Sequence, residues 1–185
     1  QGIAETLNLE FRIPKYLKDN EEEYKYFKSL DADLAIVVAY GQIIPRSFLD
    51  IAKLGFINIH ASLLPKWRGA APIQRAIMNG DKKIGVSIMK IKEKLDSGPV
   101  LISKEIELDE NTTYGEMEKK LSLMGADLLI NSLKNIVAST SQFIDQKHSE
   151  ATYAKKIDKN ETKIDWKDEA NKVLAHIHAL SPSPG

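Results

Sequence analysis

The sequence contains no cysteine and no long apolar run. Without a thiol, the chain can form no disulfide framework, no zinc–thiolate site and no cysteine nucleophile. No apolar stretch approaches the roughly 20 residues that span a bilayer, and the start of the chain has no signal-peptide pattern. We therefore expect a cytoplasmic protein without membrane contacts. Its 185 residues, 43% of them hydrophobic and 28% charged, are ordinary for one globular domain.

The charge of the chain is balanced overall but unevenly distributed. It has 26 basic and 26 acidic residues, so the chain as a whole is not expected to bind polyanions. Residues 66–94, however, contain eight Lys or Arg and only two Asp or Glu. A basic stretch of this size can contact phosphates, although most such stretches are solvated faces of ordinary domains. Both interpretations stay open on this pattern alone.

The hydrophobic pattern predicts strands that alternate with helices. Residues 34–39 are unbroken apolar and β-branched, which favours a strand buried on both faces, as in parallel sheets. Thr113 and Glu116 match a capping box, and the apolar spacing after them predicts a long helix. We further expect strands at 9–13, 56–60, 84–89 and 100–106, and helices at 21–29, from 45 toward 55, at 71–78 and at 169–180. This alternation indicates an α/β domain layered around a largely parallel sheet.

Two polar side chains stand in the expected strand 56–60. Alternation along the strand places Asn58 and His60 on one face and apolar side chains on the other. A carboxamide can donate to an oxyanion, and an imidazole can move a proton near neutral pH. Because ligands bind beyond the carboxyl ends of strands in such sheets, this pair is a candidate active site. A structural Asn and His, both satisfied inside the protein, is the alternative.

Two loops accompany this pair. Residues 62–72 contain two prolines, a glycine and Trp67 beside Arg68, although a plain surface turn rarely exposes a large aromatic. The second loop, at 94–99, carries Asp96, whose carboxylate can orient an imidazole or a water. Asp-Ser-Gly-Pro is also strong turn chemistry by itself, so an ordinary turn is the alternative for this loop.

Two long motifs resemble the folate-dependent formyltransferases. They are INIHASLLPKWRGAAPIQRAI at 57–77 and GVSIMKIKEKLDSGPVL at 85–101, and the resemblance extends from about residue 34 to the C-terminus. Within the family, WRGAAPIQ and the later TYAKKIDKNETKIDW at 152–166 resemble the members that formylate methionyl-initiator tRNA. Members that act on sugar nucleotides, and formyltetrahydrofolate hydrolases, share the Asn-x-His and the Asp but usually differ in these flanks.

The resemblance implies a reaction and a site. The formyl group of 10-formyltetrahydrofolate would pass to the α-amino group of methionine on initiator tRNA, and no metal is expected. Asn58 would stabilise the oxyanion, His60 would move the proton, and Asp96 would orient His60 or a water. The expected folate contacts are Ser62, Leu63, Leu64 and Pro65, then Gly41, Gln42, Ile43 and Ile44, and the backbone near Leu95.

A tRNA substrate gives the basic stretch a role. We expect Lys66 and Arg68 to lie near the acceptor end of the tRNA, where phosphate contacts would make binding weaken with salt. The alternative for Arg68 is that its planar guanidinium braces the loop internally.

The same resemblance implies that the chain is partial. It starts with Gln1 rather than Met and ends in the breaker cluster 181–185. Compared with the Rossmann-like, three-layer fold of the family, the first strand–helix unit would be missing. Residues 1–180 would form part of the catalytic domain, and 181–185 would begin a linker to an absent C-terminal β-barrel domain. We expect a monomer with poor stability or exposed sheet edges.

Two other functions stay open. One is a formyltransferase that acts on a sugar nucleotide or another small amine. The other is a folate-binding fragment without catalytic turnover. A dinucleotide-dependent dehydrogenase is not expected, because no Gly-x-Gly-x-x-Gly follows any predicted strand.

Overall fold

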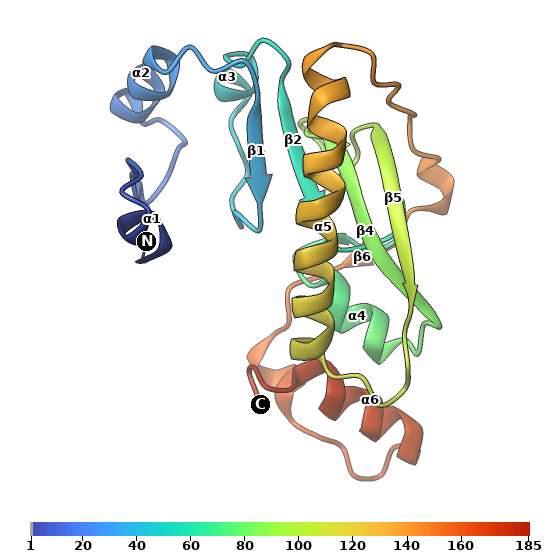
Figure 1. Ribbon diagram of the computed structural model, residues 1–185. Coiled ribbons are helices and arrows are strands. Elements are labelled where there is room, and N and C mark those ends of the chain that lie inside the picture. Colours follow the sequence, from blue (N-terminus) through green and yellow to red (C-terminus); the bar gives the residue numbers. More distant parts are fainter. Residues whose placement is uncertain (1) are drawn as a thin grey trace.

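The computed structural model describes residues 2–185 and has a central sheet flanked by helices (Figure 1), which confirms the α/β class. The helices are α1 (Gly2–Thr6), α2 (Glu21–Ser29), α3 (Arg46–Leu49), α4 (Pro72–Met78), α5 (Tyr114–Val137) and α6 (Ala170–Leu180), with 3₁₀ turns at His148–Glu150 and Lys159–Thr162. The main sheet contains β1 (Ala35–Val38), β2 (Phe56–His60), β4 (Lys83–Lys90) and β5 (Val100–Glu107). A second sheet pairs β3 (Arg68–Gly69) with β6 (Tyr153–Ala154).

The main sheet is mixed rather than largely parallel, so that part of the prediction was wrong. Its strand order is β1-β2-β4-β5, and only β1 and β2 run parallel, whereas β4 is antiparallel to both β2 and β5. The connection between β4 and β5 explains one of the two antiparallel pairs. Residues 91–99 join β4 to β5 without a helix, and two strands joined by a short loop form an antiparallel hairpin. The strand that prompted the prediction, β1, does belong to the parallel pair.

Helix α5 covers one face of the sheet. The side chains of β2 that contact α5 identify which side chains of the strand lie on the opposite face. A Cβ on Gly125 of α5 would come within 2.7 Å of Ile59 Cγ2 and would also crowd Val86, so glycine allows the helix its close approach. Ile57 and Leu129 pack together on the same side. The alternate side chains of β2 therefore project to the opposite face of the sheet.

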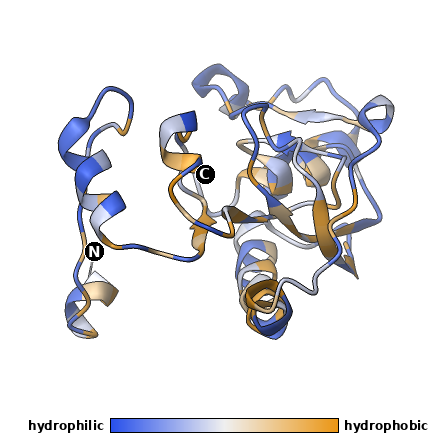
Figure 2. Ribbon diagram, turned by 90° about the horizontal axis from the view of Figure 1, so that it is seen from above, coloured by the Kyte–Doolittle hydropathy of each residue, from blue (hydrophilic) through white to orange (hydrophobic). Residues whose placement is uncertain are grey.

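A second apolar cluster lies on that opposite face. Phe48 of α3 packs with Phe56 of β2 and with Tyr24 and Phe27 of α2, and the ring centroids of Phe27 and Phe56 are 5.6 Å apart. With α5, these helices complete the three-layer arrangement. Figure 2 shows hydrophobic colours gathered on the strands at the centre of the main body, while the N-terminal segment beside it is mostly hydrophilic.

Strand β1 is less buried than its sequence predicts. Burial on both faces was expected for residues 34–39, yet Ile36 is 41% exposed and Val38 is 58% exposed. The cause is the position of the strand: α5 packs on β2 and β4, and β1 is an edge strand within residues 2–185. The expected exposed sheet edge is therefore present in the part of the chain described here.

The helices follow the predictions more closely. Thr113 caps α5, and both halves of its capping box with Glu116 are formed. Helices α2, α4 and α6 lie where the sequence places them, whereas α3 already ends at Leu49. Residues 9–13 form no strand, because they pair with no other strand within residues 2–185. None of the helices described is long and apolar enough to cross a membrane.

Candidate active site

Strand β2 and the turn after it build the centre of the site. His60, the last residue of β2, is 6% exposed, and Asn58 is half-buried two residues earlier on the same face. Their cross-strand neighbours on β4 are Ser87 and Met89. The carbonyl oxygen of His60 accepts a hydrogen bond from the Ser62 amide at 2.9 Å, so the chain turns sharply at the strand end. The carboxamide and the imidazole therefore project side by side, as the alternation predicts.

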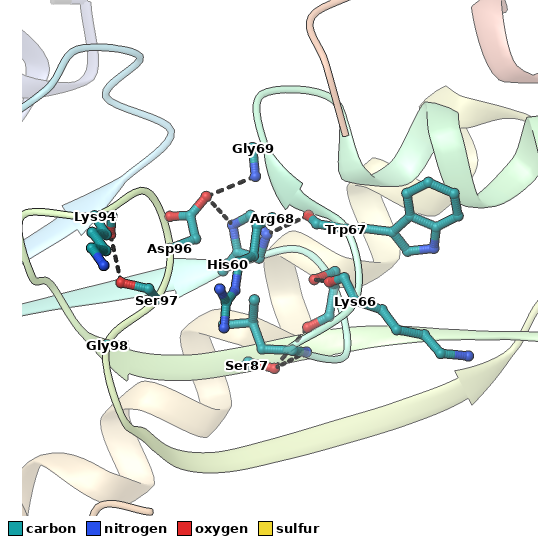
Figure 3. Close-up of polar contacts among 12 residues, drawn as sticks. His60, Lys66, Trp67, Arg68, Gly69, Ser87, Lys94, Asp96, Ser97 and Gly98 are labelled. Atoms are coloured by element: carbon teal, nitrogen blue, oxygen red, sulfur yellow. Dashed lines mark hydrogen bonds and ion pairs between the residues drawn. The ribbon is translucent and has the colours of Figure 1, made fainter. Parts of the chain in front are cut away.

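The surroundings of the imidazole fix which ring nitrogen carries the proton. His60 Nε2 lies 2.9 Å from the backbone oxygen of Trp67 (Figure 3). A carbonyl oxygen only accepts hydrogen bonds, so Nε2 donates, and the neutral ring keeps its lone pair on Nδ1. Nδ1 lies 3.8 Å from Asp96 Oδ2. The ring can therefore take up a proton at Nδ1, beside a carboxylate that stabilises the positive charge.

Backbone groups hold Asp96 in position. Its Oδ2 accepts a hydrogen bond from the Gly69 amide at 2.8 Å, and its φ of 43° lies in the left-handed region that Asp tolerates better than most residues. Two residues on, a Cβ at Gly98 would overlap the carbonyl oxygen of Lys90. The side chains of His60 and Asp96 are only 7% and 16% exposed. The loop is thus a tight turn, and it also delivers a shielded carboxylate to the imidazole.

The carboxamide of Asn58 is a polar group of the site whose hydrogen-bonding capacity is not used inside the described part of the protein. Its carboxamide makes no hydrogen bond to another side chain or backbone group within residues 2–185. Its neighbours across the strands, Val37 and Met89, are apolar. A half-buried amide without an internal partner can donate to the oxygen of a ligand. The alternative in which Asn58 is satisfied inside the protein does not fit this arrangement.

Serine side chains pin the loop that follows β2. Ser62 is 1% exposed, and its Oγ donates to the carbonyl oxygen of Lys66 at 2.6 Å. Ser87 Oγ donates to the carbonyl oxygen of Ser62 at 2.7 Å and accepts from the Leu64 amide at 3.2 Å. Of the predicted folate contacts in this loop, Ser62 is therefore buried and internally bonded. The other three, Leu63, Leu64 and Pro65, are half-buried.

The remaining predicted folate contacts lie on two connected loops. Gly41, Gln42 and Ile43 are exposed after β1, whereas Ile44 is buried in the apolar cluster of α3. Leu95, beside Asp96, is 57% exposed, and Ile43 is 82% exposed. Arg46, which begins α3 directly after the first loop, forms an ion pair of 2.9 Å with Glu93 of the second loop. Two exposed apolar side chains thus stand on loops that are tied together near the site.

The structure separates the two predicted tRNA contacts. Lys66 is exposed. Arg68 is 3% exposed, and its Nη2 donates to Gln146 Oε1 at 2.7 Å and lies 2.9 Å from His148 Nδ1. The guanidinium is therefore engaged inside the protein, which favours the alternative in which Arg68 braces its loop. A phosphate contact stays a prediction, and Lys66 is the better placed of the two.

Two residues that support the site were missed by sequence reasoning. Ser87 is the one polar side chain in the otherwise apolar run of β4 from 84 to 89, and that interruption was a usable signal. Gln146 is 8% exposed and donates from Nε2 to the carbonyl oxygens of Asp96 and Gly98, at 2.9 and 2.7 Å. It lies in a polar connection without periodicity, so no local pattern identifies it.

Two family models match parts of the chain. Residues 8–133 match the family model described as formyl transferase. The chain belongs to the formyl transferase family. Residues 156–185 also match the model described as formyl transferase, C-terminal domain. This second match begins within the segment predicted as catalytic, and the boundary at residue 180 stays a prediction. In the structure, α6 packs onto α4, and Ala179 is buried in the same cluster as Ile73.

Individual known proteins resemble the chain in sequence or in fold. Over 185 residues it is 52% identical to the methionyl-tRNA formyltransferase of Pelagibacter ubique, covering 100% of this chain and 60% of that protein. The fold matches a 4-N formyltransferase from Francisella tularensis with a TM-score of 0.77 and 23% identity, covering 90% of this chain and 68% of the other. It also matches HypX from Aquifex aeolicus in complex with tetrahydrofolic acid, with a TM-score of 0.76 and 21% identity, covering 88% of this chain and 28% of that chain. The chain therefore spans 60% of the length of its Pelagibacter relative.

Proposed function

We propose that the protein transfers the formyl group of 10-formyltetrahydrofolate to the α-amino group of methionine on initiator tRNA. The observation that carries the proposal is the grouping of Asn58, His60 and Asp96 at the end of β2. The acceptor is inferred from the relative of 52% identity, which is a methionyl-tRNA formyltransferase. The proposal includes a cytoplasmic location, where aminoacylated tRNA is available, and a monomeric state.

The three polar groups meet the needs of this reaction. The amine nitrogen forms a bond to the formyl carbon, the bond from that carbon to the donor nitrogen breaks, and a proton moves from the amine to the leaving nitrogen. Asn58 donates to the carbonyl oxygen while negative charge develops on it, an effect on the order of 10²–10³ in rate. His60 takes the proton of the amine at Nδ1 and returns it to the leaving nitrogen. Asp96, 3.8 Å away, stabilises the ring while it is charged.

A folate donor fits the residues around these groups. The formyl oxygen requires a hydrogen-bond donor, and Asn58 has one that is not used internally. The flat ring system of a folate requires apolar cover, which Leu64, Ile43 and Leu95 can supply from the surrounding loops. The structurally similar HypX was solved with tetrahydrofolic acid, which supports a folate-type donor here.

The test is a formylation assay on the intact protein. Formyl transfer from 10-formyltetrahydrofolate to methionyl-tRNA is compared with transfer to a panel of amino-sugar nucleotides and small amines. We expect methionyl-tRNA to be the preferred acceptor. Asn58→Ala should lower kcat on the order of 10²–10³, and His60→Ala on the order of 10²–10⁴. Asn131→Ala, on the exposed surface of α5, is the matched control.

Two outcomes would replace the proposal. Faster transfer to an amino-sugar nucleotide would assign the protein to the sugar-acting alternative. Thermal stabilisation by the folate without any formylated product would assign it to a non-catalytic folate-binding role. An unchanged kcat in both Asn58→Ala and His60→Ala would show that the active site does not lie at the end of β2.

A further inference from the structure

We infer that Gln146 is a positioning residue that holds the Asp96 loop and the Arg68 loop in register, so that the carboxylate of Asp96 stays opposite His60 Nδ1. The inference rests on the proposed function for its catalytic readout. Its structural readout does not depend on that function.

The side chain of Gln146 joins two loops that are remote in sequence. Its Nε2 donates to the carbonyl oxygens of Asp96 and Gly98, at 2.9 and 2.7 Å. Its Oε1 accepts from Arg68 Nη2 at 2.7 Å and from Arg68 Nε at 3.1 Å. All polar atoms of a side chain that is 8% exposed are thus paired. Such a fully bonded buried amide specifies one arrangement, because any displacement leaves polar groups without partners.

Both loops gripped by Gln146 feed directly into the site. One runs through Asp96, whose Oδ2 accepts from the Gly69 amide at 2.8 Å. The other contains Arg68, which follows Trp67, and the carbonyl oxygen of Trp67 accepts from His60 Nε2 at 2.9 Å. Gln146 therefore fixes the supports on both sides of the imidazole: the carboxylate near Nδ1 and the carbonyl at Nε2.

The segment that carries Gln146 is itself anchored at both ends. On one side, Ile144 and Val100 exchange two backbone hydrogen bonds of 2.8 Å at the start of β5. On the other side, the carbonyl oxygen of Thr152 accepts from the Arg68 amide at 2.9 Å, and its Oγ1 accepts from the Trp67 amide at 2.9 Å. A side chain on an anchored segment can hold loops in place, whereas one on a free segment would move with them.

The experiment compares two substitutions of Gln146 with a matched control in the intact protein. Gln146→Met keeps the length and volume but removes every hydrogen bond. Gln146→Glu keeps the acceptor for Arg68 but turns a carboxylate oxygen toward two carbonyl oxygens. Gln142→Met, at an exposed position of the same segment, is the control. Steady-state kinetics give kcat and KM separately, and hydrogen exchange by NMR follows the amides of Gly69 and Ile88.

We expect both Gln146 variants to lower kcat by about ten- to a hundredfold, because a misplacement of about 1 Å can cost on the order of 10² in rate. The KM for each substrate should change little, and the Gly69 amide should exchange on the order of tenfold faster, as expected on losing a charge-assisted hydrogen bond. The Ile88 amide, in the fully buried part of β4, should stay protected. The control should match the wild type in every readout.

Some results would overturn the role of Gln146, and a different result would overturn the proposed function. The inference would be overturned if Gln146→Met kept the wild-type kcat and the wild-type protection of the Gly69 amide. It would also be overturned if Gln146→Glu kept both values, because glutamate can still pair with Arg68 but cannot donate to the two carbonyl oxygens. Loss of Ile88 protection in both variants would also overturn it, because Gln146 would then support the whole fold. If the wild type formylates no acceptor, the proposed function fails, while the exchange of the Gly69 amide still decides whether Gln146 positions Asp96.

Discussion

Replacement of Asp96 by asparagine isolates the charge that faces His60. The amide has nearly the same shape, and its oxygen can still accept the hydrogen bond that the Gly69 amide gives to Oδ2 at 2.8 Å. What disappears is the negative charge 3.8 Å from His60 Nδ1. We therefore expect Asp96→Asn to fold normally and to transfer formyl groups slowly.

The size of the effect follows from this geometry. Two unit charges 3.8 Å apart interact with about 4 kcal/mol at an effective dielectric constant near 20. Because the two side chains are only 7% and 16% exposed, solvent screening removes a minor part. A loss of about 3–4 kcal/mol at the moment when His60 holds the proton corresponds to a fall in kcat on the order of 10²–10³.

The assay measures kcat and KM for both substrates, together with the urea midpoint of unfolding. Asp127→Asn, which neutralises an exposed carboxylate on α5, is the control. If Asp96→Asn keeps the wild-type kcat, the charge is not used by His60 and the reasoning is refuted. If its urea midpoint falls sharply instead, Asp96 acts mainly as a turn residue.

Three further predictions concern binding and stability. Lys66→Ala should weaken tRNA binding and lower the dependence of log affinity on log salt by about one phosphate contact; an unchanged slope in a salt titration would exclude that contact. The hydrogen bonds from Arg75 lower the pKa of Glu161 from 4.5 to about 2, so the wild type should be more stable than Glu161→Gln above pH 4.5. This advantage should vanish as the pH falls through 2, as followed by unfolding midpoints, and a pH-independent difference would contradict it. Thr113→Ala breaks the capping box of α5 and should cost about 1 kcal/mol in urea unfolding, whereas an unchanged midpoint would mean that the cap is dispensable.

Much of the geometry of the candidate site could be predicted from the sequence because its signals are local. Alternation along residues 56–60 puts Asn58 and His60 on one face whatever the rest of the fold does. The Asp-Ser-Gly-Pro turn marks the loop of Asp96 in the same way. The capping box of α5 is equally local, because its partners lie three positions apart.

The parts that were not predicted depend on contacts between distant segments. Burial of Arg68 follows from Gln146, 78 positions away, and Gln146 reaches Asp96 across 50 positions. The directions of β4 and β5 likewise depend on the connections between strands, and the apolar content of a strand does not predict its direction. Burial of β1 was overestimated because hydrophobicity does not tell an edge strand from a central one.

The hydrogen bond from His60 Nε2 to the carbonyl oxygen of Trp67 leaves Nδ1 as the ring nitrogen that is free to exchange a proton. A peptide oxygen neither gains nor releases protons in the pH range where proteins are folded, so the hydrogen on Nε2 stays in place. A proton can therefore enter or leave the ring only at Nδ1, which faces Asp96. The acceptor is a main-chain oxygen, so the course of the backbone determines which ring nitrogen of His60 exchanges the proton. Replacing the indole of Trp67 should leave this choice unchanged as long as the backbone keeps its course.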